Sequence, residues 1–451
     1  MTLWLLIPLI LCLQYIYWYI GKKAAQKVHG QKDYFLAGKG VRFFPLMMTF
    51  IGAQVGGGLV LGAADTAFEY GWWVLLYPLG TCLGLLLLGI GIGKRLTSFK
   101  TSTIAQILEI VYKSRMLKKI ASTLSIISLF MILAAQFTAS HTFLLALGLI
   151  NPLFFIAFWG VIIFYTVRGG LRAVIATDVV QATVFSLVLC GCFALLFFGG
   201  MLPSFSLKMS SFTLSSTKLV GWLLMPLLYM MIEQDMGQRC FAGDSPQTVS
   251  KAALGAGICT MLICVVPITL GVFAKTMGLT IPVGASTLMT AISFAGGPWI
   301  TALVGCAVLA AIISTATSLI NAISSNLSQD FDIFRNQENL KAAKWITLGI
   351  SVGAMVFAFY FNDIVGILIQ SYELFVSALF VPIFIALFKK HGNFLSALLA
   401  ISFGMGSFIL FKIVPLPFPA EIMNILLSFV GYGCGEVISH FRKEEVEFTI
   451  Y

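Results

Sequence analysis

The chain has 451 residues, of which 59% are hydrophobic and 10% are charged, with a formal net charge of +10. A soluble domain carries about 25% charged residues, so this composition excludes a soluble protein and indicates an all-α integral membrane protein. Cytoplasmic loops of membrane proteins are enriched in Lys and Arg. This enrichment explains the positive net charge, and we expect no nucleic-acid partner.

Apolar segments long enough to cross a bilayer, which takes about 20 residues, recur along the whole chain. We predict about 13 membrane-spanning helices, at residues 2–20, 43–64, 73–93, 120–148, 153–167, 174–200, 219–238, 252–274, 298–327, 345–361, 364–388, 394–413 and 421–440. The stretch 281–297 is bounded by Gly and Pro, and we expect a short interfacial or re-entrant helix there.

The distribution of basic residues predicts the orientation of these spans. If the spans alternate in direction, 24 of the 28 Lys and Arg residues fall in loops on one side. The remaining four are Lys208, Lys218, Lys275 and Lys412. The crowded side is expected to be cytoplasmic, which places the N-terminus outside and the C-terminus inside the cell (plasma or inner) membrane.

The second span contains a run of glycines at Gly52, Gly56, Gly57, Gly58 and Gly62. Each glycine inside a helix costs about 1 kcal/mol relative to Ala, so the helix is expected to break near the middle of the bilayer. Main-chain groups freed there are tolerated where protein or a wet cavity satisfies them, and secondary transporters coordinate ions in this way. The alternative is close helix packing through glycines spaced four apart.

An acidic residue, Asp178, follows the turn sequence RGGLR by about one helical turn, just inside the sixth span. A carboxylate at membrane depth is a functional candidate. The alternative is a structural salt bridge to Arg172 or Arg168. In the eleventh span, Glu373 is either a pocket residue or paired with a neighbour.

The seventh span, 219–238, is also interrupted, because it holds Pro226 and the polar run from Glu233 to Gly237. It lies five spans after the first broken helix and runs in the opposite direction. This parity predicts two inverted five-helix repeats. The predicted parts are an extra helix and loop at 1–42, the repeats at 43–200 and 201–388, and two final helices with a tail at 389–451.

The ninth span carries a polar stripe on one helical face. Residues spaced i, i+3, i+4 and i+7 share a face, and here the face comprises Ala311, Ser314, Thr315, Ser318, Asn321, Ser325 and Ser328. One or two such hydroxyls could simply bond back to their own helix. A stripe of this length instead favours a site for a small hard cation, which prefers oxygen ligands, and sodium suits a set without His, Cys or carboxylate clusters.

Several motifs together resemble the sodium/solute symporters, a family that includes sodium–glucose, sodium–proline, pantothenate and sialic-acid transporters. These motifs are FLAGKG at 35–40, GGLRAVIATDVVQ at 169–181, GQRCFAGDS at 237–245 and AAIISTATSLINAISSNLSQDF at 310–331. The resemblance implies a LeuT-like fold, with a five-plus-five inverted repeat, one extra helix before it and two after it.

The resemblance also implies functional residues. The principal sodium site would comprise carbonyls of Gly52, Val55 and Ala311 and hydroxyls of Ser314 and Thr315. A second sodium ion, or a proton, is left open at Asp178, Thr317 and Ser318. The implied substrate positions are Gln54, Gly56, Leu59, Tyr229, Thr260 and Gln370, and Glu233 replaces an amide common in relatives.

We therefore expect no enzyme but a sodium-coupled symporter that imports a small organic solute by alternating access, with membrane lipid around it and the monomer as functional unit. The ion expected is one sodium, with a second left open. The alternatives are a proton-coupled carrier that uses Asp178, a channel, or a membrane-embedded enzyme. An enzyme would need a catalytic cluster of His, Cys and carboxylates, which the sequence does not offer.

Overall fold

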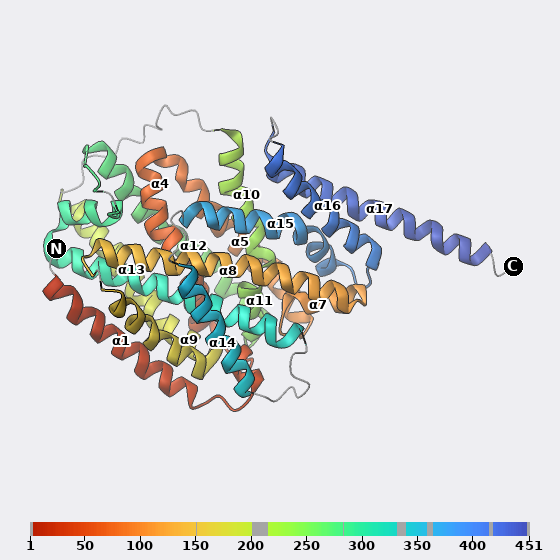
Figure 1. The fold of residues 1–451 in the computed structure, drawn as a ribbon, viewed down its shortest axis with the longest axis horizontal. Coiled ribbons are helices and arrows are strands. Elements are labelled where there is room, and N and C mark those ends of the chain that lie inside the picture. Colours follow the sequence, from red (N-terminus) through yellow and green to blue (C-terminus); the bar gives the residue numbers. More distant parts are fainter. Residues whose placement is uncertain are drawn as a thin grey trace.

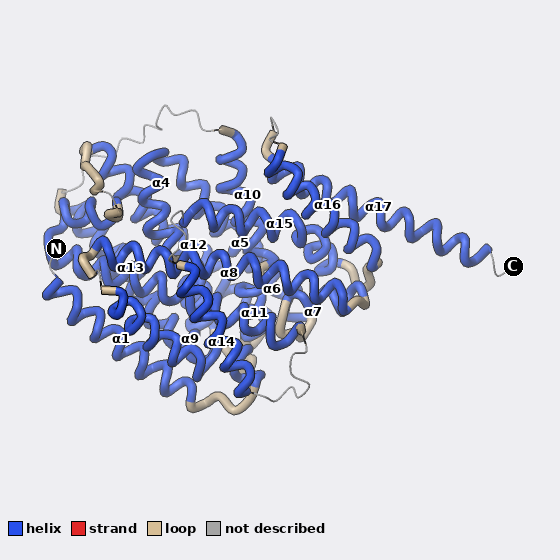
Figure 2. Tube along the Cα trace, viewed as in Figure 1, coloured by secondary structure: helices blue, strands red, loops and turns tan. Residues whose placement is uncertain are grey.

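The computed structural model describes residues 3–149, 151–200, 215–282, 284–331, 340–358, 364–414 and 418–448. Within these ranges the chain is helical, and the β-pairing is one isolated bridge between Val41 and Gly243 (Figure 2). Ten helices of the described part are long and apolar enough to cross a membrane, and two shorter apolar helices accompany them. The prediction of an all-α, multi-pass membrane protein is confirmed, whereas the count of 13 stays a prediction.

The helices form one bundle with a peripheral pair at its edge. The N-terminal elements are α1 (Leu3–Ala25), α2 (Gln31–Leu36), α3 (Phe43–Gln54), η1 (Gly58–Gly62), α4 (Ala63–Tyr70), η2 (Gly71–Leu75), α5 (Leu76–Leu87), η3 (Leu88–Ile92), α6 (Gly93–Ser98), α7 (Ile104–Tyr112), α8 (Arg115–Ala146) and α9 (Pro152–Phe198). The C-terminal elements are α10 (Ser216–Ile232), α11 (Gln234–Ala242), α12 (Pro246–Thr276), α13 (Thr287–Asp330), α14 (Leu340–Phe357), α15 (Ile364–Phe388), α16 (Phe394–Ile413) and α17 (Ala420–Phe448).

Two long helices are interrupted by glycines with positive φ. Gly170 (φ 51°) divides α9 at the predicted turn between the fifth and sixth spans, and Gly297 (φ 68°) divides α13. Residues other than glycine rarely adopt this conformation. The first part of α13, from Thr287 to the break at Gly297, corresponds to the short helix expected at 281–297.

The second half of α13 lies at the centre of the bundle. In the most apolar stretch of 18 residues in α13, 94% of the residues are buried. The helix packs against α9, α8 and α1. The helices α16 and α17 pack against each other at one end of the molecule (Figure 1). Because α13 is enclosed, its polar stripe faces protein and not lipid.

Both spans expected to break do so. The first consists of α3, an irregular turn at Val55 and Gly56, and then η1 and α4. The second consists of α10 and α11, which are separated at Glu233 by extended backbone (φ −73°, ψ 148°). These two interruptions position the site described below.

Some predictions lie outside the described residues. They are the start of the second repeat at 201–214, residues 359–361 of the tenth span and the N-terminal residue 2 of the first span. Lys208 also lies outside the described residues. The proposed division into repeats and flanking helices stays a prediction.

Candidate functional site

The helix break at Val55 frees main-chain groups inside the bundle. Val55 is fully buried and has non-helical backbone angles (φ −80°, ψ 79°). The Gly57 N–H donates a hydrogen bond of 2.8 Å to the side-chain oxygen of Gln136, a residue of α8. A side-chain amide has therefore taken the place of a helical carbonyl at the break.

The polar stripe of α13 faces this break directly. The Thr315 hydroxyl donates to the main-chain oxygen of Gly52 over 3.0 Å. A Cβ atom added at Gly52 would lie 2.2 Å from the Ser314 hydroxyl oxygen. Gly52 is thus needed for the close approach of α3 to α13, and the predicted sodium ligands of the two helices lie side by side.

The remaining two predicted sodium ligands are in the same region. Val55 ends α3 at the break, and Ala311 is fully buried on α13, one helical turn before Ser314 and Thr315. Within this region the contact between Gly52 and Thr315 brings a main-chain oxygen of α3 and a hydroxyl oxygen of α13 together. Oxygens of these kinds are the ligands that a small hard cation takes.

Asp178 of α9 lies next to the contact between α3 and α13 and binds a residue of each helix. Its carboxylate is fully buried and accepts hydrogen bonds from Thr49 (2.5 Å) and Ser314 (2.7 Å). It also forms an ion pair with Arg239, in which the nearest nitrogen and oxygen are 3.5 Å apart.

The structural alternative for Asp178, a pair with Arg172 or Arg168, is not found in the structure. Arg172 pairs with Asp33 at 3.0 Å, and Arg168 lies over the ring of Phe164. Likewise Glu373 pairs with Lys412 at 2.8 Å, which settles its open alternative in favour of a paired residue.

Arg239 is the residue that the sequence analysis missed. It was counted among basic residues of a cytoplasmic loop, which is wrong, because its side chain is fully buried on α11. Its guanidinium donates to the main chain and hydroxyl of Thr49, to Asp235 and to Ser318, in addition to the pair with Asp178. The signal was present in the sequence, since Asp235 precedes Arg239 by four residues on a helix face.

The three residues left open for a second ion are brought together only in part. Ser318 accepts a hydrogen bond of 2.5 Å from Arg239, which also pairs with Asp178. The Thr317 hydroxyl instead donates to the main-chain oxygen of Ser314 on its own helix. The guanidinium of Arg239 therefore lies between Asp178 and Ser318.

A narrow cavity of about 20 Å³ lies beside the break. Among the expected substrate residues, Gln54, Gly56 and Leu59 line it, together with Gln136 and Glu233. A volume of this size holds about one water molecule, so the helices must separate before an organic solute can enter.

The other expected substrate residues lie elsewhere. Tyr229 is fully buried behind the cavity, with its ring 4.5 Å from that of Tyr372. Thr260 is buried on α12 and is not part of the cavity lining. Gln370 is exposed on α15, whereas its neighbours Leu368 and Tyr372 line the cavity.

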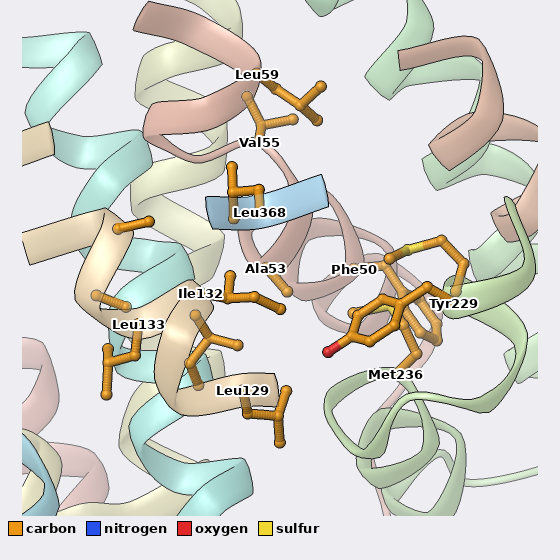
Figure 3. Close-up of a cluster of buried hydrophobic side chains, with 14 of the residues drawn as sticks. Phe50, Ala53, Val55, Leu59, Leu129, Ile132, Leu133, Tyr229, Met236 and Leu368 are labelled. Atoms are coloured by element: carbon orange, nitrogen blue, oxygen red, sulfur yellow. The ribbon is translucent and has the colours of Figure 1, made fainter. Parts of the chain in front are cut away.

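Apolar side chains surround the break on the sides that carry no polar ligands. Figure 3 shows Val55, Leu59, Ile132 and Leu368 close together, with the hydroxyl of Tyr229 pointing toward α8. All four side chains are buried. Dry packing of this kind strengthens electrostatic interactions inside the site.

Polar atoms continue from the site along α13. Asn321 and Ser325 are fully buried, and their side-chain polar atoms have no hydrogen-bond partner among the described residues. The hydroxyl oxygen of Ser328, one turn further, is also buried without a hydrogen-bond partner in the described part of the chain, although the residue as a whole is only partly buried. Buried polar groups normally bind a partner or ordered water, so this face suits a hydrated path toward the end of α13.

The sequence of the chain is similar to that of a known protein family. Residues 34–404 match the model of the sodium:solute symporter family. A sodium/pantothenate symporter of Haemophilus influenzae is 27% identical over 192 residues, or 41% of this chain and 40% of that protein. The match thus spans less than half of the length of this relative.

Solved structures show a similar fold. A sodium-coupled sialic acid symporter, in a substrate-bound outward-open state, superposes with a TM-score of 0.75 at 16% identity, covering 96% of this chain and 97% of the other. The transporter Mhp1, in a closed conformation, gives 0.60 at 14% identity, covering 89% and 93%. MhsT in complex with L-phenylalanine gives 0.56 at 13% identity, covering 88% and 98%.

Proposed function

The chain belongs to the sodium:solute symporter family, and from this premise we propose that it imports a small organic solute together with sodium by alternating access. One observation carries the proposal. The freed main chain at Gly52 lies within one hydrogen bond, 3.0 Å, of the Thr315 hydroxyl on α13.

We propose that sodium binds between α3 and α13. Its ligands are the main-chain oxygens of Gly52, Val55 and Ala311 and the hydroxyl oxygens of Ser314 and Thr315. The Ser314 hydroxyl donates its proton to Asp178, and the Thr315 hydroxyl donates to the main-chain oxygen of Gly52. Lone pairs on both hydroxyl oxygens are therefore available to a cation. The buried carboxylate of Asp178 adds a negative charge next to the site without being a ligand.

We further propose one sodium ion per transport cycle. A second ion at Asp178, Thr317 and Ser318 would have to share the space in which Arg239 contacts both Asp178 and Ser318. The guanidinium carries a fixed positive charge with several directed donors, so Arg239 supplies the charge that a second sodium would bring.

The solute site of the proposal is the cavity beside the break, with Gln54, Gly56 and Leu59 as the first contacts. Tyr229 stands behind Tyr372 and would move with α10 when the cavity opens. Thr260 and Gln370 are not among the proposed contacts, because neither lines the cavity.

In the proposed cycle, sodium ties α3 to α13 in the state that accepts the solute. Escape of sodium along Asn321, Ser325 and Ser328 loosens this contact and releases the solute inside. One charge that crosses about 100 mV yields roughly 2.3 kcal/mol, which corresponds to about 40-fold accumulation of a neutral solute. A sodium gradient adds to this, so the cycle requires no ATP.

Orientation and assembly complete the proposal. With Arg239 set aside as buried, 23 of the 28 basic residues remain on one side, and we assign that side to the cytoplasm, with the N-terminus outside and the C-terminus inside the plasma or inner membrane. Lipid surrounds the bundle, and we take the monomer as the functional unit, because each of the proposed ligands comes from one chain.

Thermal unfolding of the purified protein in detergent tests the sodium site. We expect a higher unfolding temperature in NaCl than in KCl at equal ionic strength, since a ligand at about 100 times its Kd stabilises by about 2.7 kcal/mol. Ser314→Ala should abolish the difference. The control is Ser407→Ala, which removes a buried serine of α16 whose hydroxyl donates to the main-chain oxygen of Gly404 on the same helix. Equal unfolding temperatures in both salts for the native chain would overturn the proposal.

The main rival is a proton-coupled carrier of the same fold that uses Asp178. In proteoliposomes, uptake of the organic solute that is driven by a sodium gradient at constant pH supports the proposal. Uptake that continues without sodium and follows an imposed pH gradient supports the rival.

A further inference from the structure

We infer that the transported solute carries an ammonium group, either a protonated amine or a quaternary ammonium, and that Glu233 binds it. This inference rests on the proposed function, because it takes the cavity beside the helix break as the solute site. It adds the chemical class of the solute, which the family alone does not define.

Glu233 has the position that a solute-binding residue requires. It is the extended residue between α10 and α11, so it lies at the second helix break and faces the first one. Only 3% of the residue is exposed, and it forms part of the cavity lining. One carboxylate oxygen accepts a hydrogen bond of 3.0 Å from the Gln54 amide, which holds the side chain across the gap between the two broken helices.

Among the described residues, no ion pair joins the carboxylate of Glu233 to Lys, Arg or His. Arg239, the nearby guanidinium, already pairs with Asp178 and Asp235. Asp235 also lines the cavity, and its second oxygen has no hydrogen-bond partner in the described part of the chain.

The balance of charges around the site therefore points to a cationic group on the solute. Three carboxylates, those of Asp178, Glu233 and Asp235, are buried in this region, and the guanidinium of Arg239 pairs with Asp178 and Asp235. One bound sodium ion leaves one negative charge. Burial of an uncompensated charge is strongly unfavourable, and an ammonium group on the solute removes this cost once the cavity has closed around it.

The aromatic lining favours the same class. The rings of Tyr77 and Tyr372 line the cavity beside Glu233, and Tyr229 packs on Tyr372. Aromatic faces attract ammonium groups, and the attraction grows when water is excluded. An anionic solute would meet two carboxylates in the lining, Glu233 and Asp235, and no Lys or Arg there.

A specific alternative is that Glu233 holds a proton and accepts a neutral solute through hydrogen bonds. The closed site is neutral in both cases. The two hypotheses differ in the charge of the solute and in the effect that removing the charge of Glu233 has on solute binding. The experiment compares these two quantities.

The first measurement uses the native chain in detergent and pairs of probes that differ in charge alone. Choline is compared with 3,3-dimethyl-1-butanol, and a series of primary alkylamines with alcohols and carboxylates of the same length. We expect that ammonium probes raise the unfolding temperature in NaCl, and that their neutral and anionic partners do not. The inference is overturned if neutral or anionic partners stabilise equally well, or if none of the ammonium probes stabilises.

The second measurement uses Glu233→Gln, which keeps the size of the side chain and one oxygen that can accept from Gln54, and removes the negative charge. We expect at least a tenfold higher half-saturating concentration of the best ammonium probe. The control is Glu373→Gln, which alters a buried carboxylate of α15 that pairs with Lys412 and does not line the cavity. An unchanged concentration for Glu233→Gln would contradict the inference, and the comparison of probes on the native chain needs no variant that folds.

The outcome separates this inference from the proposed function. Ammonium probes that bind equally well in NaCl and KCl would support the solute class and contradict sodium coupling. Neutral solutes that bind only in NaCl would support sodium coupling and contradict the solute class.

Discussion

Replacement of Thr315 by valine tests the sodium site with the smallest change of shape. Valine has the size of threonine but lacks the hydroxyl that donates to Gly52 over 3.0 Å and that we assign to sodium. Thr315 is 4% exposed and therefore held in a closed environment. The loss of the hydroxyl removes one of five proposed ligands while the packing is kept.

The size of the effect follows from the energy of a polar contact to a charge. Such contacts contribute about 1.5–3 kcal/mol, which corresponds to a sodium half-saturation concentration about 10- to 150-fold higher in Thr315→Val. The lost hydrogen bond to Gly52 costs about 1 kcal/mol in any salt. For this reason the informative quantity is the difference between NaCl and KCl, not the absolute unfolding temperature.

The assay is a sodium titration of the unfolding temperature in detergent at constant ionic strength. Thr315→Ser is the matched control, because it restores the hydroxyl and removes only a methyl group. We expect its half-saturation to stay within about threefold of the native value, which equals roughly 0.6 kcal/mol. If Thr315→Val titrates like the native chain, the hydroxyl is not a sodium ligand and the assignment fails.

Three further changes address the neighbours of the site. Gly52→Ala places a Cβ atom 2.2 Å from the Ser314 oxygen. Overpacking of this kind costs about 1–3 kcal/mol, and we expect Gly52→Ala to lose the sodium-dependent stabilisation. The control Gly191→Ala, which has open space around the added Cβ atom, should retain it. Arg239→Met leaves buried carboxylates unpaired, which costs about 3–5 kcal/mol, and native-like thermal stability in KCl would refute the pairing. Asp178→Asn should weaken sodium binding at every pH tested; sodium binding that is unchanged would show that the carboxylate does not act on the site.

The sequence was informative where one residue type has a single strong effect on the backbone. The glycines around Gly56 and the polar run that begins at Glu233 predicted both helix breaks, because glycine and clustered polar residues weaken a membrane helix wherever it is packed. Spacing along α13 likewise placed Ser314 and Thr315 on one face, since helical periodicity is a local property.

The sequence was less informative where contacts join distant parts of the chain. Arg239 was assigned to a cytoplasmic loop because it follows a polar run near the predicted end of a span. Its burial depends on Asp178, which is 61 positions earlier in the numbering, and on Ser318 of α13. Gln370 was expected in the substrate site, yet the rotation of α15 directs its neighbours Leu368 and Tyr372 to the cavity. Local patterns do not define which face of an almost uniformly apolar helix turns inward.

Equilibrium binding of ²²Na⁺ to the purified protein in detergent tests the central claim most directly. The account predicts one sodium ion bound per chain in the native protein and none in the double variant Ser314→Ala/Thr315→Val. Two ions per chain would contradict the assignment of Arg239 as the second positive charge. Undiminished binding in the double variant would contradict the proposed sodium site between α3 and α13.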